Sequence, residues 1–133
     1  MSDALVNPIP VLAFVPREDR PAMTAIFDKD FRPLFVDTLP EMLDALHHEP
    51  IPVLVCDTAF EGGTWKDVSR AIQSVASPPQ LVVVSRNADL YDWGEVLRAG
   101  GRDLIQKPYD SKETLKSVWW AAYEWLKGKG FAA

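Results

Sequence analysis

The stretch "QLVVVSRNADLYDWGEVLRAGGRDLIQKPYD", residues 80–110, decides the expected fold. It begins with an apolar run that ends on a hydroxyl, Ser85, and it closes with a second apolar run that ends on an ammonium, Lys107, followed by Pro108. Between the two runs lies a helix-length segment that stops at a pair of glycines, as helices often do. A strand, a helix and a second strand in this order predict two parallel strands joined by a right-handed crossover.

The same alternation extends over the rest of the chain. Helix-length segments separate three further short apolar runs, at residues 11–15, 33–37 and 52–56. Because most of these runs are apolar throughout rather than alternating, they indicate strands that are buried on both faces. We therefore expect a doubly wound α/β domain, a five-stranded parallel sheet between two layers of helices, over residues 9–127. Flexible termini are expected at residues 1–8 and 128–133.

Local signals mark where the helices should begin. Thr64 followed by Asp67 has the spacing of a capping box, in which the first turn's side chains and backbone bond reciprocally. Thr38 and Glu41 have the same spacing. Asp19 lies two positions before a proline, and proline is favoured in the first helical turn, so we expect Asp19 to cap the first helix.

The apolar positions of two helices predict which of their faces are buried. In the helix after Ser85, three residues line up at helical spacing: Leu90, Trp93 and Leu97. In the last helix the expected buried stripe consists of Leu115, Val118, Trp119, Ala122 and Leu126.

Composition limits the function. A chain of 133 residues, 47% of them hydrophobic and 25% charged, is typical of one soluble domain. Its net charge of −5 argues against direct nucleic-acid binding, and no apolar run approaches the ~20 residues that a membrane span needs. The single cysteine, Cys56, excludes an internal disulfide and indicates a reducing compartment.

Polar side chains stand at the ends of three of the expected strands: Asp57, Ser85 and Lys107. The carboxyl ends of parallel strands share one edge of the sheet, where ligands bind in open α/β folds. A carboxylate at this edge can attack an activated phosphoryl group while a lysine and a hydroxyl stabilise charge on the phosphoryl oxygens. The sequence therefore predicts an anion site around Asp57. The alternative that Asp57 only caps the following loop stays open at this point.

These motifs resemble the receiver domain of response regulators, the phosphoacceptor module of two-component signalling. Within residues 80–110 the likeness rests on a strand ending in a hydroxyl, a helix ending in Ala-Gly, and a strand ending in Lys-Pro and an aromatic, Tyr109. The segment "PVLVCDTAF" (52–60) matches the strand that ends in the acceptor aspartate. The resemblance covers residues 9–127, nearly the whole chain.

The resemblance implies a flavodoxin-like sheet in the strand order 2-1-3-4-5. It implies that Asp57 is the phosphoacceptor, Ser85 the switch hydroxyl and Lys107 the phosphate-binding lysine. It further implies a bacterial, cytoplasmic signalling domain rather than an enzyme, with a histidine kinase or a phosphotransfer protein as its partner.

The chain departs from the family at the metal site. Receivers usually carry two acidic residues directly after the first strand, and these hold Mg²⁺. Here Pro16 and Arg17 stand at those positions, with acidic residues displaced onward. Mg²⁺ usually takes one or two carboxylates plus phosphate and water, so with Asp57 alone we expect weak Mg²⁺ binding or none. The candidate phosphate or metal region comprises Arg17, Glu18, Asp19 and Ala59. Arg17 could return part of the missing positive charge to a phosphate. The alternative that Glu18 and Asp19 reach the site as late metal ligands stays open.

The last helix carries two aromatics outside its expected core stripe, Trp120 and Tyr123. They fall on the surface that receivers use to dimerise and to contact partners, and exposed aromatics indicate a contact site. The alternative is that they fold over the lysines of their own helix.

Two functions stay open: a receiver phosphorylated on Asp57, with a homodimer as one assembly, and a pseudo-receiver regulated by docking without phosphate. Leu104, where the family has an aromatic switch residue, is a further departure. An unrelated nucleotide-binding domain is disfavoured, because a Gly-rich fingerprint does not follow the first strand.

Overall fold

The computed structural model of the protein describes residues 8–128, apart from the side chains of residues 90 and 91, so the prediction for Leu90 lies outside what is described. Most of the two segments for which the sequence predicts flexible termini, namely residues 1–7 and 129–133, lie outside the described residues.

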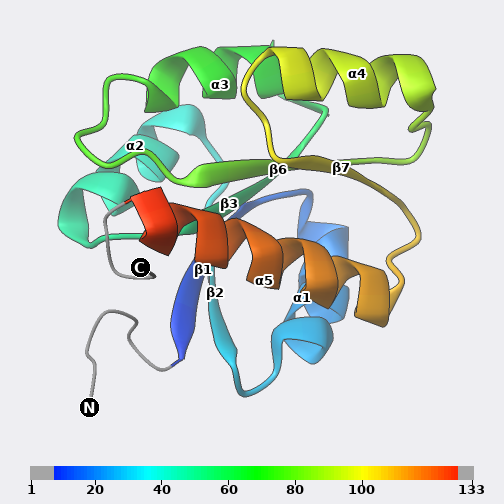
Figure 1. The fold of residues 1–133 in the computed structure, drawn as a ribbon, viewed down its shortest axis with the longest axis horizontal. Coiled ribbons are helices and arrows are strands. Elements are labelled where there is room, and N and C mark those ends of the chain that lie inside the picture. Colours follow the sequence, from blue (N-terminus) through cyan, green and yellow to red (C-terminus); the bar gives the residue numbers. More distant parts are fainter. Residues whose placement is uncertain (1–7, 129–133) are drawn as a thin grey trace.

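Five parallel strands form the central sheet: β1 (Ile9–Phe14), β2 (Phe31–Phe35), β3 (Val53–Asp57), β6 (Gln80–Ser85) and β7 (Asp103–Gln106). Their order across the sheet is β2-β1-β3-β6-β7 (Figure 1). Because β6 and β7 are the fourth and fifth strands of this sheet along the chain, this is the predicted order 2-1-3-4-5. The predicted doubly wound fold is confirmed.

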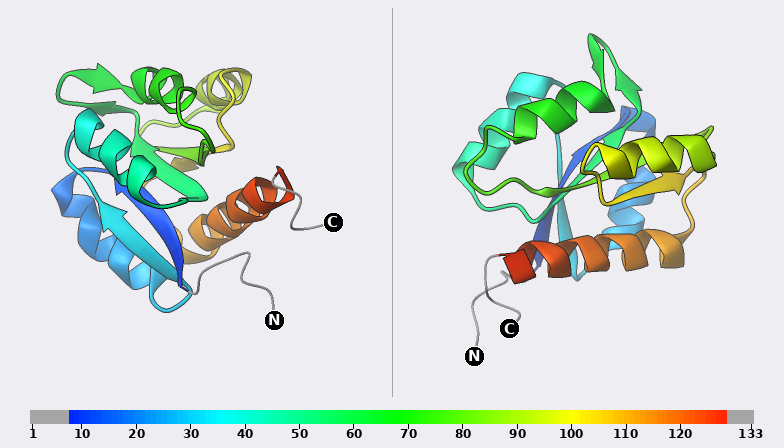
Figure 2. Two further views of the ribbon diagram at one scale, coloured as in Figure 1. Left: turned by 90° about the vertical axis from the view of Figure 1, so that its left-hand side faces the viewer. Right: turned by 45° about the horizontal axis from the view of Figure 1, so that its top comes forward.

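Helices cover both faces of the sheet. On one face lie α1 (Arg20–Phe27) and α5 (Ser111–Gly128), and on the other lie α2 (Leu39–His48), α3 (Trp65–Ile72) and α4 (Leu90–Arg98) (Figures 1 and 2). Alternate residues of a strand point to opposite faces, so a central strand must be apolar at every position. In β3, Val53 and Val55 contact the first pair of helices, while Leu54 and Cys56 contact the other three. Burial raises the pKa of the Cys56 thiol, which packs as a small apolar side chain.

Two buried helix faces differ from the prediction. On α4, Val96 is buried, whereas Trp93 and Leu97 are exposed. On α5, Trp119 is 43% exposed and lies edge-on against the ring of Phe31, with ring centroids 4.7 Å apart. Val118, Ala122 and Leu126 are buried as predicted. The buried stripe of α5 also includes Thr114, Ser117, Ala121 and Trp125.

Two small elements were not predicted. A 3-10 turn, η1 (Arg17–Asp19), leads from β1 into α1. After β3, the strands β4 (Ala59–Phe60) and β5 (Gly63–Thr64) form an antiparallel hairpin that projects beyond the sheet (Figure 2). Its turn contains Gly62 at a φ of 96°, a backbone conformation that favours glycine.

The capping predictions had different outcomes. At the start of α3 the Thr64 hydroxyl oxygen accepts from the Lys66 N–H at 3.2 Å, and Asp67 Oδ2 accepts from the Thr64 N–H at 2.8 Å, so the predicted capping box is formed. At the start of α2 only half of the box forms: Thr38 accepts from the N–H of Glu41, whose own carboxylate accepts from the residue before Thr38. The prediction for Asp19 is wrong, as the site geometry explains.

Candidate functional site

The ends of β3, β6 and β7 bring the three predicted polar residues to one edge of the sheet. Asp57 is the last residue of β3 and pairs with Val84 of β6. Ser85 is the next residue of β6 and pairs with Gln106, which immediately precedes Lys107. The parallel register therefore places Asp57, Ser85 and Lys107 at successive positions along the carboxyl edge.

Lys107 is the centre of the site. Its Nζ donates to Asp57 Oδ2 at 2.6 Å and to Asp19 Oδ2 at 2.8 Å. The side chains of Lys107 and Asp19 are 8% exposed, and that of Asp57 is 14% exposed. Burial acts to lower the pKa of Lys107, but hydrogen bonds to the two carboxylates outweigh it and raise the pKa above its ordinary value. The lysine is thus a firmly charged ammonium between two acids.

Asp19 is part of this site and not the cap of α1. Its Oδ2 accepts from Lys107 and, at 2.8 Å, from the hydroxyl of Tyr109. Among the described residues, these two donors take the place of the backbone N–H groups of α1's first turn, because a buried ammonium is a stronger partner for a carboxylate than a peptide N–H. In the sequence, Asp19 lies further along the chain than the family's acidic pair. In the structure it still lies beside the acceptor site, because it bonds the same ammonium as Asp57.

Sequence analysis did not anticipate two contacts of the site. Tyr109 is the aromatic of the Lys-Pro-aromatic motif. Its hydroxyl donates to Asp19, which lies 90 positions earlier, and the sequence carries no local signal for such a pairing. Thr58 Oγ1 donates to Asp57 Oδ1 at 3.1 Å, so both oxygens of the Asp57 carboxylate have a donor. Burial, followed by the bond to Asp19, raises the pKa of Tyr109. The phenol is therefore a lasting hydrogen-bond donor.

Ser85 is buried at the end of β6. Its hydroxyl oxygen accepts from the backbone N–H of Asn87 at 3.1 Å. A serine hydroxyl that accepts one bond still has a proton to donate. Ser85 is therefore able to donate to an anion that binds beside Asp57.

The remaining candidates lie at the rim or outside the pocket. Arg17, a candidate to supply charge to a phosphate, is exposed and bonds Asp37 at 2.8 Å. Its hydrogen bond lowers the pKa of the Asp37 carboxyl. Glu18 is exposed, 3.7 Å from Arg86. Ala59 is the first residue of the exposed hairpin, two positions after Asp57.

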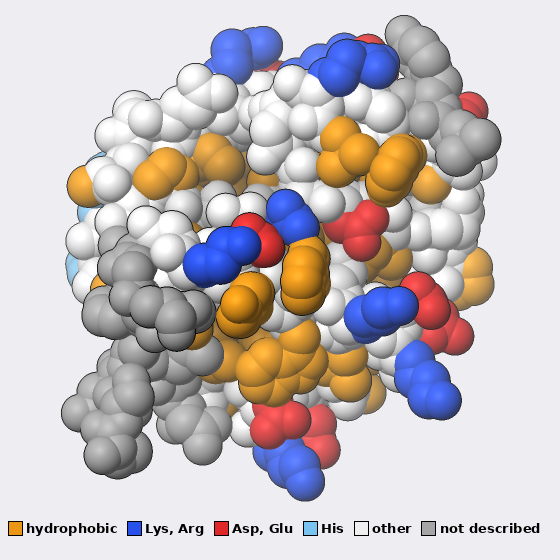
Figure 3. All heavy atoms as spheres, viewed as in Figure 1, with side chains coloured by type: hydrophobic (Ala, Val, Ile, Leu, Met, Phe, Trp, Pro, Cys, Tyr) orange, Lys and Arg blue, Asp and Glu red, His pale blue; other side chains and the backbone are white. Residues whose placement is uncertain are grey.

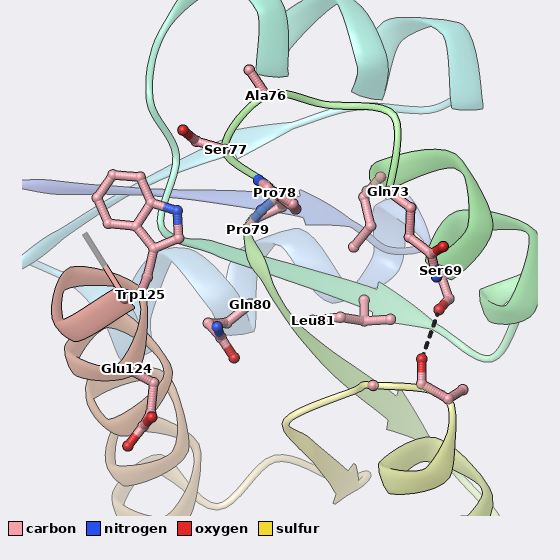
Figure 4. A pocket seen from close by; sticks show the side chains of 14 residues that line it. Ser69, Gln73, Ala76, Ser77, Pro78, Pro79, Gln80, Leu81, Glu124 and Trp125 are labelled. Atoms are coloured by element: carbon pink, nitrogen blue, oxygen red, sulfur yellow. Dashed lines mark hydrogen bonds between the residues drawn. The ribbon is translucent and has the colours of Figure 1, made fainter. Parts of the chain in front are cut away.

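Two cavities flank the sheet at opposite ends. One of about 640 Å³ is lined by Asp19, Lys107, Tyr109 and the small residues of α1, and so opens beside the acid–lysine cluster. The other, of about 490 Å³, lies between the C-terminal parts of α3, α4 and α5 (Figure 4). There the Ser69 hydroxyl donates to the Ala99 carbonyl at 3.2 Å, and the residues lining this cavity within the described chain include no Lys or Arg. Of these two cavities, the first is the one that basic side chains line, namely Arg86 and Lys107.

Comparison with known proteins identifies the fold. No family model and no curated protein matches the sequence. Among solved structures, a response regulator from Thermotoga maritima superposes with a TM-score of 0.75 at 23% identity, covering 86% of this chain and 97% of that chain. A CheY-like receiver domain protein from Methanospirillum hungatei gives a TM-score of 0.76 at 15% identity, with 92% and 99% covered. The beryllofluoride-activated NtrC4 receiver domain dimer gives 0.78 at 18% identity, with 87% and 98% covered.

The chain has the receiver-domain fold. In it, Asp57, Lys107 and Asp19 occupy the carboxyl edge of the sheet, where open α/β folds bind their ligands. No helix of residues 8–128 combines the length and the apolar character needed to cross a membrane.

The resemblance to receivers implies Mg²⁺, and the donor set fits such an ion. Asp19 and Asp57 converge on Lys107, and Mg²⁺ takes one or two carboxylates together with phosphate and water. Asp19, one of the two displaced acidic residues, bonds the same ammonium as Asp57 and would supply the second carboxylate. Within residues 8–128 no group of three or more acidic, His or Cys side chains forms a metal site by itself. Protein groups would therefore provide only part of the ion's coordination.

The exposed surface of α5 carries a pair of aromatic side chains. On α5, Trp120 is 53% exposed and stacks on the exposed Tyr123, with ring centroids 5.6 Å apart. Arg102 and Lys127 lie over these rings, each 5.9 Å from a ring centroid. Figure 3 shows hydrophobic side chains gathered on this face among acidic and basic ones. Both rings are exposed, and Lys127 of the same helix lies over Tyr123, as the alternative expects.

Proposed function

We propose that this chain is the receiver domain of a bacterial two-component response regulator and accepts a phosphoryl group on Asp57. The observation that carries the proposal is the ammonium of Lys107, almost buried and 2.6 Å from the Asp57 carboxylate at the ligand-binding edge of the sheet. A histidine kinase or a phosphotransfer protein in the cytoplasm would be the donor. The domain's chemistry would be limited to its own phosphorylation, without enzymatic turnover on another molecule.

The transfer step follows from the side chains present. An oxygen of Asp57 attacks the phosphorus of a phosphohistidine, the P–N bond breaks as the O–P bond forms, and the imidazole nitrogen leaves with the electron pair. Lys107 exchanges one carboxylate contact for a phosphoryl oxygen, and Ser85 turns its hydroxyl proton toward another. A divalent cation held by Asp19 and Asp57 would neutralise charge on the incoming group. An acyl phosphate on Asp57 is the product.

Intact mass measurement tests this proposal. Incubation with a small phosphodonor, with and without Mg²⁺, should add about 80 Da to the protein, the mass of one phosphoryl group. Asp57→Asn should abolish the gain, while Asp37→Asn, which removes an exposed carboxylate after β2, should retain it. An unmodified wild-type protein under every condition would exclude phosphorylation of Asp57 by small donors and favour the second candidate.

The second candidate is a pseudo-receiver that works by docking or dimerisation. It is favoured by the exposed aromatic pair Trp120 and Tyr123 and by Leu104, which stands where an aromatic switch residue is expected. The signalling surface would be the α4-β7-α5 face in both candidates. Sedimentation of the wild type and of Trp120→Ala/Tyr123→Ala separates them: a dimer that the double variant loses and that is independent of phosphodonor supports the pseudo-receiver.

A further inference from the structure

The transfer step does not use the Tyr109 hydroxyl. This hydroxyl nevertheless donates to Asp19 Oδ2 at 2.8 Å inside the acceptor site. The same oxygen accepts from Lys107 at 2.8 Å. Asp19 is thus held by two donors from the segment after β7, although it belongs to the turn between β1 and α1. Asp19 thereby lies beside the ammonium that also bonds Asp57, and its side chain makes no capping bond to α1.

We propose that Tyr109 is a positioning residue, which fixes Asp19 beside Asp57 so that the two carboxylates can share a divalent cation. The inference rests on the proposed function, because only an acceptor site needs that cation. It explains how a chain without acidic residues directly after β1 still brings a second carboxylate to the site.

The sharing of Lys107 makes the phenol necessary. Without the Tyr109 hydroxyl, Asp19 Oδ2 keeps Lys107 as its donor, and the same ammonium also serves Asp57. Asp19 then either draws Lys107 away from Asp57 or turns out toward the cavity of about 640 Å³ that these residues line. Either movement lowers the affinity of the two carboxylates for a shared divalent cation. Partners that orient metal-binding carboxylates typically contribute roughly 10- to 100-fold to metal affinity.

Tyr109→Phe isolates the hydroxyl. The ring packs against the buried cluster under α1 and α5, and phenylalanine preserves that contact. Ser117→Ala is the matched control, since it also removes a hydroxyl that donates to an aspartate, Asp103 at 2.7 Å, between β7 and α5 outside the acceptor site.

Titration of the protein with Mn²⁺ alone, followed by paramagnetic broadening of the Asp57 and Thr58 amide signals, measures the effect without any phosphorylation. Tyr109→Phe should need roughly 10- to 100-fold more Mn²⁺ than the wild type for half-broadening, while Ser117→Ala should match the wild type. Equal Mn²⁺ requirement in Tyr109→Phe and wild type, or no selective broadening in the wild type, would overturn the proposal.

A double-variant cycle tests whether Tyr109 acts through Asp19. At a fixed Mg²⁺ concentration, Asp19→Asn/Tyr109→Phe should be phosphorylated as slowly as Asp19→Asn alone, since the phenol then has no carboxylate to position. Two defects that multiply would show that Tyr109 acts independently of Asp19 and would overturn the inference. Failure of the proposed function has a different signature, namely a wild-type protein that gains no phosphoryl group on Asp57 at all.

Discussion

The starts of α1 and α3 carry similar sequence signals for an acidic capping side chain. Only at α3 does that side chain bond the backbone at the start of the helix. Asp67 lies in the first turn of α3 and bonds the backbone N–H of Thr64, as its spacing predicts. Asp19 precedes α1 with a proline in the first turn, yet it is bound by Lys107, 88 positions away in the chain. The α3 box is exposed, whereas the Asp19 carboxylate is nearly buried.

The difference teaches when a local signal decides the structure. At α3 the capping groups are exposed to solvent, and the nearby backbone N–H groups are the strongest donors available to them. At α1 the fold brings an ammonium into a site of low exposure, where a charged donor interacts more strongly than a peptide N–H. Local capping rules therefore fail where the tertiary structure gathers charge, and in this chain that is the candidate functional site.

The largest effect is expected from Lys107→Met. It leaves Asp19 and Asp57 facing each other without their shared cation, and removing one partner of a buried ion pair costs about 3–5 kcal/mol of unfolding free energy. Urea unfolding at neutral pH measures the loss. Lys107→Met/Asp57→Asn should recover most of it. A single-variant loss below about 1 kcal/mol would contradict this account of the site.

A smaller loss, about 2 kcal/mol of unfolding free energy, is expected for Asp19→Ala, because the Tyr109 hydroxyl loses its acceptor while Lys107 keeps Asp57. The measurement that bears on the comparison is amide exchange. Protection of the α1 amides should stay at the wild-type level at low denaturant, since Asp19 bonds Lys107 and Tyr109. Selective fraying of the first turn of α1 would instead restore Asp19 to the role of a cap.

Thr64→Ala should cost about 1 kcal/mol of unfolding free energy, the usual contribution of a capping side chain. The lost hydrogen bond is the one that the Thr64 hydroxyl oxygen accepts from Lys66. Thr64→Ser keeps that oxygen and serves as the control in the same urea titration. If serine and alanine destabilise equally, the methyl group and not the cap is responsible.

The fold could be predicted from the sequence because its determinants are local. The three central strands β1, β3 and β6 are largely apolar runs, and the runs at 81–85 and 103–107 agree with β6 and β7 to within one residue. Buried helix faces were harder to predict. Trp119 has the spacing of the core stripe but is 43% exposed and lies against Phe31, whereas Trp125 of the same helix is buried.

The site could be predicted only as far as strand ends allow. Asp57, Ser85 and Lys107 follow from the rule that parallel strands end at one edge. Asp19 was a candidate from its place soon after the first strand, and Tyr109 was the aromatic of the Lys-Pro motif. The bonds that Asp19 forms with Lys107 and Tyr109 join segments far apart in the chain and have no local signal. The bond between Arg17 and Asp37 could not be predicted either, because Asp37 follows a different strand, β2.

The smallest effect concerns the alkaline limit of the pocket. Tyr109 and Lys107 have pKa values raised above their ordinary values of 10.0 and 10.5, the first by burial and the second by its two carboxylates despite burial. Both groups therefore keep their protons in the folded state at a pH where the unfolded chain loses them. Their contribution to stability is complete below about pH 10 and declines as the pH rises above it.

Phenolate absorbance makes this visible, since one of the three tyrosines should stay neutral until the protein unfolds. Tyr109→Phe should lack that late step, and Tyr123→Phe should retain it. Complete ionisation of all three tyrosines in the folded protein near pH 10 would mean that the Tyr109 hydroxyl is not bound to Asp19. The pocket at the start of α1 would then differ from the exposed cap at α3 by much less than the structure indicates.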